Sequence, residues 1–223
     1  MLSTVTNAIT PAIKALANRY INISVIYFAP YFWAFNRPWY KTSFEYEKID
    51  RLRLKKDGSS LNINTLLYDT LSGFRIGTRD GLFLLKEEEN GRQDHSFYFE
   101  SKNEKSIGNN QIFSLLKDKQ QNIWVGTFGG GLNKVLFDAN RKVEGFQRIT
   151  EQEGLPNNAI YSILEDENGF LWMSTDEGIV QYHPISTIMH HFNMEDGLSA
   201  NNFRKSSYMA LENGYFIMGG LMG

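Results

Sequence analysis

Residues 109–118 read Asn-Asn-Gln-Ile-Phe-Ser-Leu-Leu-Lys-Asp and lead into Ile-Trp-Val-Gly-Thr at 123–127. A matching phrase, Asn-Asn-Ala-Ile-Tyr-Ser-Ile-Leu-Glu-Asp, occupies 157–166 and leads into Leu-Trp-Met-Ser-Thr at 171–175. The two phrases begin at positions 109 and 157, 48 residues apart. A repeat of this length predicts one structural unit that is used several times.

Each unit alternates short apolar segments with turn-forming residues. In the second full copy the apolar segments are Ala159–Leu164, Phe170–Ser174 and Ile179–Tyr182. They are rich in β-branched and aromatic residues and too short for helices, so we expect strands. Asn-Gly at 168–169 and 213–214 supplies the positive φ that a tight hairpin turn needs.

A fourth strand is expected in each unit, over 145–149 in one and 189–192 in the next. Three or four antiparallel strands in a unit of about 45 residues are typical of a β-propeller blade. A lone sheet of this size cannot bury both faces, whereas stacked blades cover one another. The predicted fold class is therefore all-β, built of β-propeller blades.

The repeat is recognisable about four times. Weaker copies occur at 66–78 and 201–220, so that the four units are expected near 61–85, 109–135, 157–182 and 201–223. Propellers close with four to eight blades. We therefore expect residues 45–223 to form a partial propeller, either a piece of a longer one or one that closes by oligomerising.

The composition of the 223 residues limits the classes of function. The chain has no cysteine, which excludes disulfides, thiol catalysis and zinc–thiolate sites. Its net charge of −2 does not show the excess of basic residues that is typical of nucleic-acid-binding proteins. Nothing in the sequence requires a cofactor.

Residues 1–44 differ from the rest of the chain because they hold basic residues and no acidic one. Residues 10–20 have the pattern of an N-capped amphipathic helix, and Ile23–Phe35 is an apolar run that contains Pro30. This run is too short to span a bilayer comfortably. Three interpretations stay open: degenerate blade strands, a targeting or anchor segment, or a start foreign to the native domain.

The repeat resembles the two-component regulator propeller family, whose pattern is Asn-x-Ile-x-x-Ile-x-x-Asp-x-x-Gly-x-Ile-Trp-Ile-Gly-Thr-x-x-Gly-Leu. Residues 109–132 and 157–179 follow it nearly throughout, and the linkers at 146–158 and 192–203 match as well. The resemblance extends over about residues 57–223.

This resemblance implies a sensor region of Bacteroides-type hybrid two-component histidine kinases. Such regions are typically extracytoplasmic, and many are thought to detect oligosaccharides. It implies a periplasmic location, an oligosaccharide ligand and a partner in a neighbouring propeller module or a second copy. Kinase activity and any membrane contact would belong to segments outside this sequence.

Several residues are of types that often have a function, but their positions favour a structural role. Trp124 and Trp172 are suited to stacking on sugar rings, yet their mid-strand positions favour the core between blades. Arg75 stands at the same position of the first unit, which indicates a degenerate or edge blade or a polar group in a pocket; we favour degeneration.

Three further patterns do not meet the requirements of the binding motifs that they resemble. The glycine-rich stretch 126–131 lacks the lysine of a phosphate-binding loop, and 166–169 lacks the other ligands of a calcium loop. Adjacent residues point to opposite faces of a strand, so His190 and His191 cannot bind one ion together, and His183 is expected to be structural. We predict no catalytic residue and no metal site.

The Asn pairs that precede the first strand of three units hold the ligand-binding candidates, Asn110, Asn158 and Asn202. Asparagine at such positions usually caps local backbone groups. In a propeller these loops gather near one rim, where the amides are also suited to sugar hydroxyls.

Three hypotheses follow for the function. The first is a non-catalytic propeller that senses a ligand and changes the geometry of its downstream domains. The second is a scaffold for association between propeller modules, because exposed blade faces are apolar. The third is a carbohydrate-active enzyme, against which the aliphatic inner strands argue.

Overall fold

The computed structural model describes residues 62–220 apart from 70–72, 89–90 and 212–213, all within the compact unit Leu61–Gly223. The expectations for residues 1–44 lie outside the described residues. Short 3-10 turns at Glu151–Glu153 and Met194–Asp196 are the only helical elements among the described residues; every other element is a strand.

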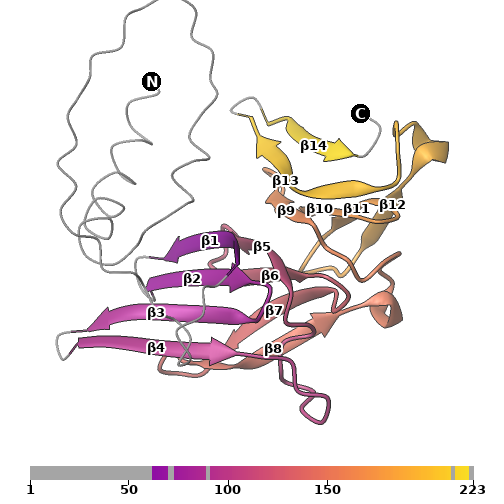
Figure 1. Ribbon diagram of the computed structural model, residues 1–223. Helices are drawn as coiled ribbons and strands as arrows, with labels where there is room; N and C mark the ends of the chain where they lie inside the picture. Colours follow the sequence, from indigo (N-terminus) through magenta and orange to yellow (C-terminus); the bar gives the residue numbers. More distant parts are fainter. Residues whose placement is uncertain (1–61, 70–72, 89–90, 212–213, 221–223) are drawn as a thin grey trace, which may run out of the picture. The chain divides into compact units, whose positions relative to one another are not determined.

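Three four-stranded antiparallel sheets follow one another along the chain (Figure 1). The first consists of β1 (Ile63–Asp69), β2 (Gly73–Thr78), β3 (Leu82–Glu88) and β4 (Gly91–Phe97). The second consists of β5 (Ile112–Lys117), β6 (Ile123–Thr127), β7 (Leu132–Phe137) and β8 (Val143–Ile149). The third consists of β9 (Ser162–Glu165), β10 (Leu171–Thr175), β11 (Gly178–Tyr182) and β12 (Met189–Phe192). Each sheet is a blade in simple up-and-down order, which confirms the predicted fold class.

A fourth sheet contains β13 (Phe203–Ala210) and β14 (Phe216–Gly220). We number the four blades in chain order. The strand expected over Ala159–Leu164 begins only at Ser162, because Ala159 forms an isolated bridge with Phe128 of blade 2. The fourth strands expected near 145–149 and 189–192 are present as β8 and β12.

The first strands of the blades lie next to one another. β5 contacts β1 on one side and β9 on the other, and β13 contacts β9 and β5. The four inner strands therefore gather toward a common axis, as in a propeller.

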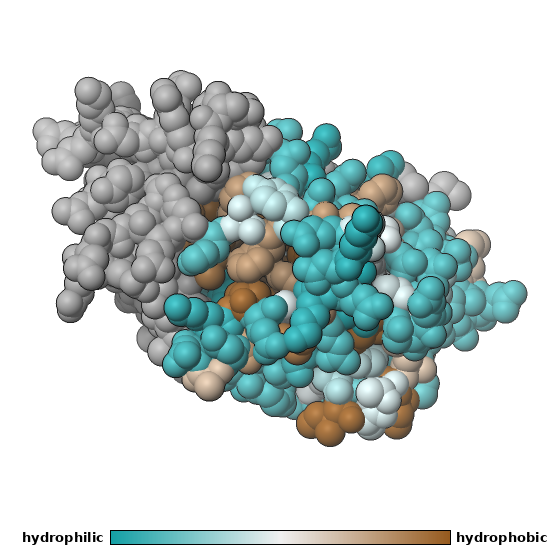
Figure 2. All heavy atoms as spheres, turned by 90° about the horizontal axis from the view of Figure 1, so that it is seen from below, coloured by the Kyte–Doolittle hydropathy of each residue, from teal (hydrophilic) through white to brown (hydrophobic). Residues whose placement is uncertain are grey.

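Apolar layers between neighbouring blades form the core. One layer joins blades 2 and 3 and includes Trp124, Leu132, Leu171, Met173 and Val180. The other joins blades 1 and 2 and includes Leu82, Ile112, Leu115, Ile123 and Val125. The central strand β6 is buried along its whole length because it faces a layer on both sides. The face in Figure 2 is largely hydrophilic, with apolar residues emerging in small patches.

One side-chain pair recurs at a spacing of six residues and closes the first hairpin of the blade. Trp124 Nε1 donates to Asp118 Oδ2 at 2.7 Å, and Trp172 Nε1 donates to Asp166 Oδ2 at 2.9 Å. The same carboxylates accept backbone N–H groups of the turn, from Asn122 in blade 2 and from Phe170 in blade 3. We call this arrangement the Asp–Trp pair.

Blade 1 keeps the aspartate and replaces the tryptophan by Arg75, again six residues on. Arg75 is 1% exposed, and its Nη1 lies 3.5 Å from Asp69 Oδ2. Lys117 Nζ approaches the same carboxylate at 2.8 Å, and the Phe137 ring lies 5.7 Å from the guanidinium. Burial lowers the pKa of the Arg75 guanidinium, and the charge of Asp69 opposes this shift. Blade 1 has four regular strands, so our interpretation of Arg75 as a sign of degeneration is wrong.

Substitution Asp118→Ala tests the Asp–Trp pair. It removes the acceptor of a buried indole N–H as well as two bonds to Asn122. An unsatisfied buried donor costs about 1–3 kcal/mol, and bonds to a charged acceptor add to this loss. We expect the free energy of unfolding in urea to fall by about 2–4 kcal/mol, measured by fluorescence and circular dichroism.

The matched control is Asp138→Ala. Asp138 Oδ1 accepts backbone N–H groups of Asn140 and Lys142 in a similar turn, but it binds no indole. We expect a loss of about 1 kcal/mol there. Equal losses in the two variants would contradict a special role for the pair.

Candidate functional site

The predicted ligand residues Asn110 and Asn158 lie where one blade is linked to the next, which we call the linker end. Asn110 Oδ1 accepts the N–H of Phe99 at 2.7 Å, and Asn158 Oδ1 accepts that of Glu151 at 2.9 Å. Both amide oxygens therefore hold the linker that arrives from the preceding blade. Their part in ligand binding stays a prediction.

In blade 4 the same position belongs to Asn201 and not to Asn202. Asn201 Oδ1 accepts the N–H of Met194, seven residues earlier, as Asn158 does with Glu151. Asn202 is exposed, and its side chain makes no hydrogen bond to any described residue. Ala200 stands where blade 3 has Asn157, so aligning the two Asn-Asn pairs placed Asn202, instead of Asn201, opposite Asn158.

A threonine closes the loop that follows the second strand of each complete blade. Thr78, Thr127 and Thr175 each donate to the carbonyl oxygen of a following glycine, at 2.9–3.0 Å. Each also accepts a backbone N–H of the loop. The glycines are Gly81, Gly131 and Gly178, all with positive φ. Within the glycine-rich stretch 126–131, Gly126 and Thr127 end β6 and residues 128–131 form the loop to β7.

These loops surround an aromatic cluster at the linker end. Phe113 and Tyr161 stand at equivalent positions of blades 2 and 3, and their rings stack at 5.6 Å and 15°. Phe128 lies 5.4 Å from Phe113 and 6.4 Å from Tyr161, with 41% of its surface exposed. Phe113 is buried, so Phe128 is the ring of blade 2 that is open to solvent beside the start of blade 3.

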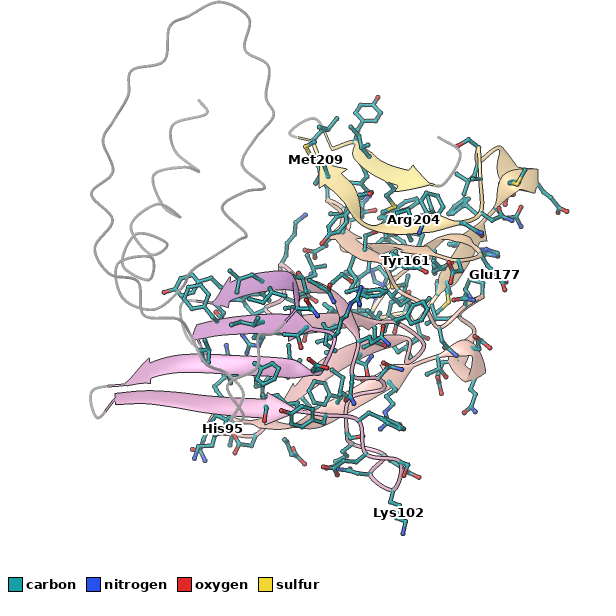
Figure 3. All side chains as sticks on the ribbon, in the orientation of Figure 1. His95, Lys102, Tyr161, Glu177, Arg204 and Met209 are labelled. Atoms are coloured by element: carbon teal, nitrogen blue, oxygen red, sulfur yellow. The ribbon has the colours of Figure 1, made fainter. Side chains whose placement is uncertain are left out.

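A carboxylate adjoins this cluster. The Tyr161 hydroxyl donates to Asp176 Oδ1 at 2.9 Å. Burial is the main cause that raises the pKa of Tyr161 to about 12, and the hydrogen bond and charge of Asp176 act in the same direction. The positive charge of Arg204 on β13 opposes the shift. Figure 3 shows Tyr161 and Arg204 on neighbouring elements.

We define the linker-end surface by Phe113, Phe128, Tyr161, Asp176 and Arg204. Sequence analysis did not identify it. One signal was available, because Phe113 and Tyr161 stand at the same position of two matching phrases, as do Phe128 and Asp176. What the sequence alone could not supply is the contact between successive blades that brings these four residues together.

The tryptophans lie between blades, as predicted, but they are not equally covered. Trp124 is 1% exposed and meets Tyr182 edge-on at 6.3 Å. Trp172 is half-buried, stacks on Phe192 at 5.7 Å and lines a cavity of about 460 Å³ between blades 3 and 4. Other residues that line this cavity include Phe203, Phe216 and Met218.

The remaining candidates have structural contacts. Residues 166–169 form the turn between β9 and β10, where Gly169 has φ of 84°. His183 Nδ1 contacts the backbone N–H and hydroxyl of Ser186, and His191 Nε2 contacts the carbonyl oxygen of Glu177. Among the described residues, no group of three His, Asp or Glu side chains is arranged to hold a metal ion.

Comparison with known proteins supports the resemblance. Residues 106–129 and 154–177 match the model of the two component regulator propeller family. These two segments lie at equivalent positions of blades 2 and 3. The matched segments contain the Asn loops, the inner strands and both Asp–Trp pairs. No curated protein matches the chain.

Three solved structures share the fold. The extracellular domain of BT3049 from B. thetaiotaomicron, assigned to a hybrid two component system, is 22% identical with a TM-score of 0.58, over 74% of this chain and 21% of that one. The extracellular domain of BT4673 from the same organism, assigned to a one component system, is 21% identical with a TM-score of 0.54, over 72% and 20%. PorZ, a surface component of the type-IX secretion system of Porphyromonas gingivalis, is 13% identical with a TM-score of 0.51, over 72% and 26%. The chain therefore spans about a fifth of the first two extracellular domains.

No helix of the described residues is long and apolar enough to cross a membrane.

The titration of Tyr161 tests the geometry of the linker-end surface. Because its folded-state pKa of about 12 lies above the ordinary value of 10.0, the folded state holds this proton more tightly. The contribution of this raised pKa to the free energy of unfolding is fully present below pH 10 and is lost as the pH rises toward 12. Ultraviolet difference absorbance of the wild type against Tyr161→Phe should show one phenol that ionises near pH 12.

Asp176→Asn separates the causes of the shift. It removes the carboxylate charge and leaves burial, so we expect the pKa of Tyr161 to decrease and to remain above the ordinary value. An ordinary pKa in the wild-type protein would contradict the contact between blades 2 and 3 at this end.

Proposed function

We propose that this chain is a non-catalytic ligand-recognition segment of a hybrid two-component sensor, that it acts in the periplasm, and that its ligand is an oligosaccharide. The observation that carries the proposal is the aromatic face beside Asp176 at the linker end. Flat apolar rings suit the apolar faces of pyranose sugars, and carboxylates and amides suit their hydroxyls. The family repeats and the extracellular domains of similar fold support the sensor role and the location.

The linker end is suited to transmitting a signal. Backbone contacts cross between blades there, because Gly129 and Gly131 donate to the carbonyl oxygen of Asn158 at 3.0 and 2.9 Å. A ligand that touches Phe128 and Tyr161 together contacts both sides of this junction. It can shift the protein between two arrangements only if it binds one of them more tightly.

Substitution Phe128→Ala tests ligand recognition. The exposed Phe128 ring can be removed with little effect on the core, and aromatic contacts contribute about 0.5–1.5 kcal/mol. We expect affinity for a bound saccharide to fall about tenfold, since about 1.4 kcal/mol corresponds to a factor of ten. Calorimetry with tri- to hexasaccharides of glucose, xylose, arabinose, galactose and galacturonic acid measures this loss.

Tyr68→Ala is the matched control. Tyr68 is an exposed aromatic residue near the end of β1, at the hairpin end of blade 1 and away from the linker end. It should leave the affinity unchanged. The proposal fails if no saccharide of the panel binds, or if both variants weaken binding equally.

A second candidate function is association with another propeller module. Residues that alternate on one face of β13 and β14 and in the turn between them are large, apolar and exposed: Met209, Leu211, Tyr215 and Ile217. Contiguous apolar surface of this kind is typical of protein interfaces. In blades 2 and 3 the next blade packs against the corresponding strands.

Light scattering of the purified chain tests association. We expect a mass above that of the monomer at micromolar concentration and a shift toward the monomer in Ile217→Glu, because a buried charge opposes the contact. Ile185→Glu, at a residue that is 80% exposed in a loop, should leave the mass unchanged. A monomeric wild-type chain would refute self-association.

A further inference from the structure

Arg204 occupies, in blade 4, the position that an aromatic residue holds in blades 2 and 3. The asparagines that fix the linkers set the register, namely Asn110, Asn158 and Asn201. Three residues after them come Phe113, Tyr161 and Arg204. The inner strand β13 lies against β9, so a cation stands beside the stacked aromatic rings.

This cation is exposed and forms no ion pair with any described residue. Its positive charge acts on Tyr161 of the aromatic cluster. By contrast, Arg75 in blade 1 is buried against Asp69, and Arg148 in blade 2 donates to Ser106 and Asn103. Arg204 is therefore available to a ligand.

The charged groups of the surface are arranged in order along the blades. The carboxylate of Asp176 belongs to the loop between β10 and β11 in blade 3, and one of its oxygens is bound by Tyr161. Glu177 follows it and is exposed. Arg204 belongs to the next blade. A ligand that spans the aromatic rings thus meets carboxylates from one blade and a guanidinium from the next.

We propose that the linker-end surface selects an anionic saccharide, with Arg204 as the contact for its carboxylate or sulfate group. This inference rests on the proposed function and names its ligand class. A guanidinium offers paired N–H donors in a plane, which match the two oxygens of a carboxylate or sulfate. Phe128 and Tyr161 contact the sugar ring, and Asp176 accepts from its hydroxyls.

Calorimetry with three probes tests the inference: trigalacturonic acid, a neutral galactose trisaccharide and a sulfated chondroitin disaccharide. The wild-type chain should bind an acidic probe at least tenfold more tightly than the neutral one. The acidic probe that binds more tightly identifies the anionic group as carboxylate or sulfate. Its affinity should also fall as sodium chloride is raised, while that of the neutral probe stays constant.

Arg204→Gln should lower the affinity for the acidic probe about tenfold and leave the neutral probe unaffected. Lys102→Gln removes an equally exposed cation from a loop far from Arg204 in Figure 3 and should change neither. Equal binding of neutral and acidic probes, unchanged in Arg204→Gln, overturns the anionic ligand and leaves the proposed function standing. If none of these probes binds, and no saccharide of the earlier panel binds, both the inference and the proposed function are overturned.

Discussion

The burial of the second strand between two neighbouring blades is the constraint on which the rest of the structure depends. A blade has two faces, and neither can be left in water without losing the apolar contacts that hold it. β6 meets this condition by facing blade 1 on one side and blade 3 on the other. A polar group carried into these layers costs about 1–3 kcal/mol if it is left unsatisfied. The Asp–Trp pair is the solution that blades 2 and 3 share.

Blade 1 and blade 4 solve the same problem in different ways. Blade 1 keeps Asp69 and places Arg75 where the indole would be, so a charge takes over the role of a neutral donor. Blade 4 has apolar residues at both positions, with Leu211 at the turn and Ile217 on the strand, and there they are 37% and 51% exposed. Removing both partners of a hydrogen bond leaves no unsatisfied group, whereas removing one does. Blade 1 thus changes one member of the pair and keeps a charged contact to the other, whereas blade 4 changes both.

The sequence was sufficient to predict what each unit forms by itself. Strand length, alternation and Asn-Gly turns depend on neighbours in the chain, and the order and class of the strands followed from them. Two errors arose where a contact between units decides the outcome. Ala159 pairs with Phe128 of the preceding blade, so β9 begins later in the sequence than expected. Arg75 is stabilised by Asp69 from the neighbouring strand and does not indicate a degenerate blade. The misplacement of Asn202 has a different cause, because the Asn-Asn pair of blade 4 begins at the capping position whereas the pair of blade 3 ends there.

The linker-end surface combines positions that are the same in successive blades with positions that differ between them. The threonine, the glycine and the asparagine of this end serve the backbone, and they recur because each loop has to be closed in the same way. The side chain three places after the asparagine does not close a loop, so it differs between blades: Phe113, Tyr161 and Arg204. Adjacent inner strands bring these side chains together without any strain on the scaffold. A propeller of this kind can therefore change the chemistry of its rim while the layers between its blades stay the same.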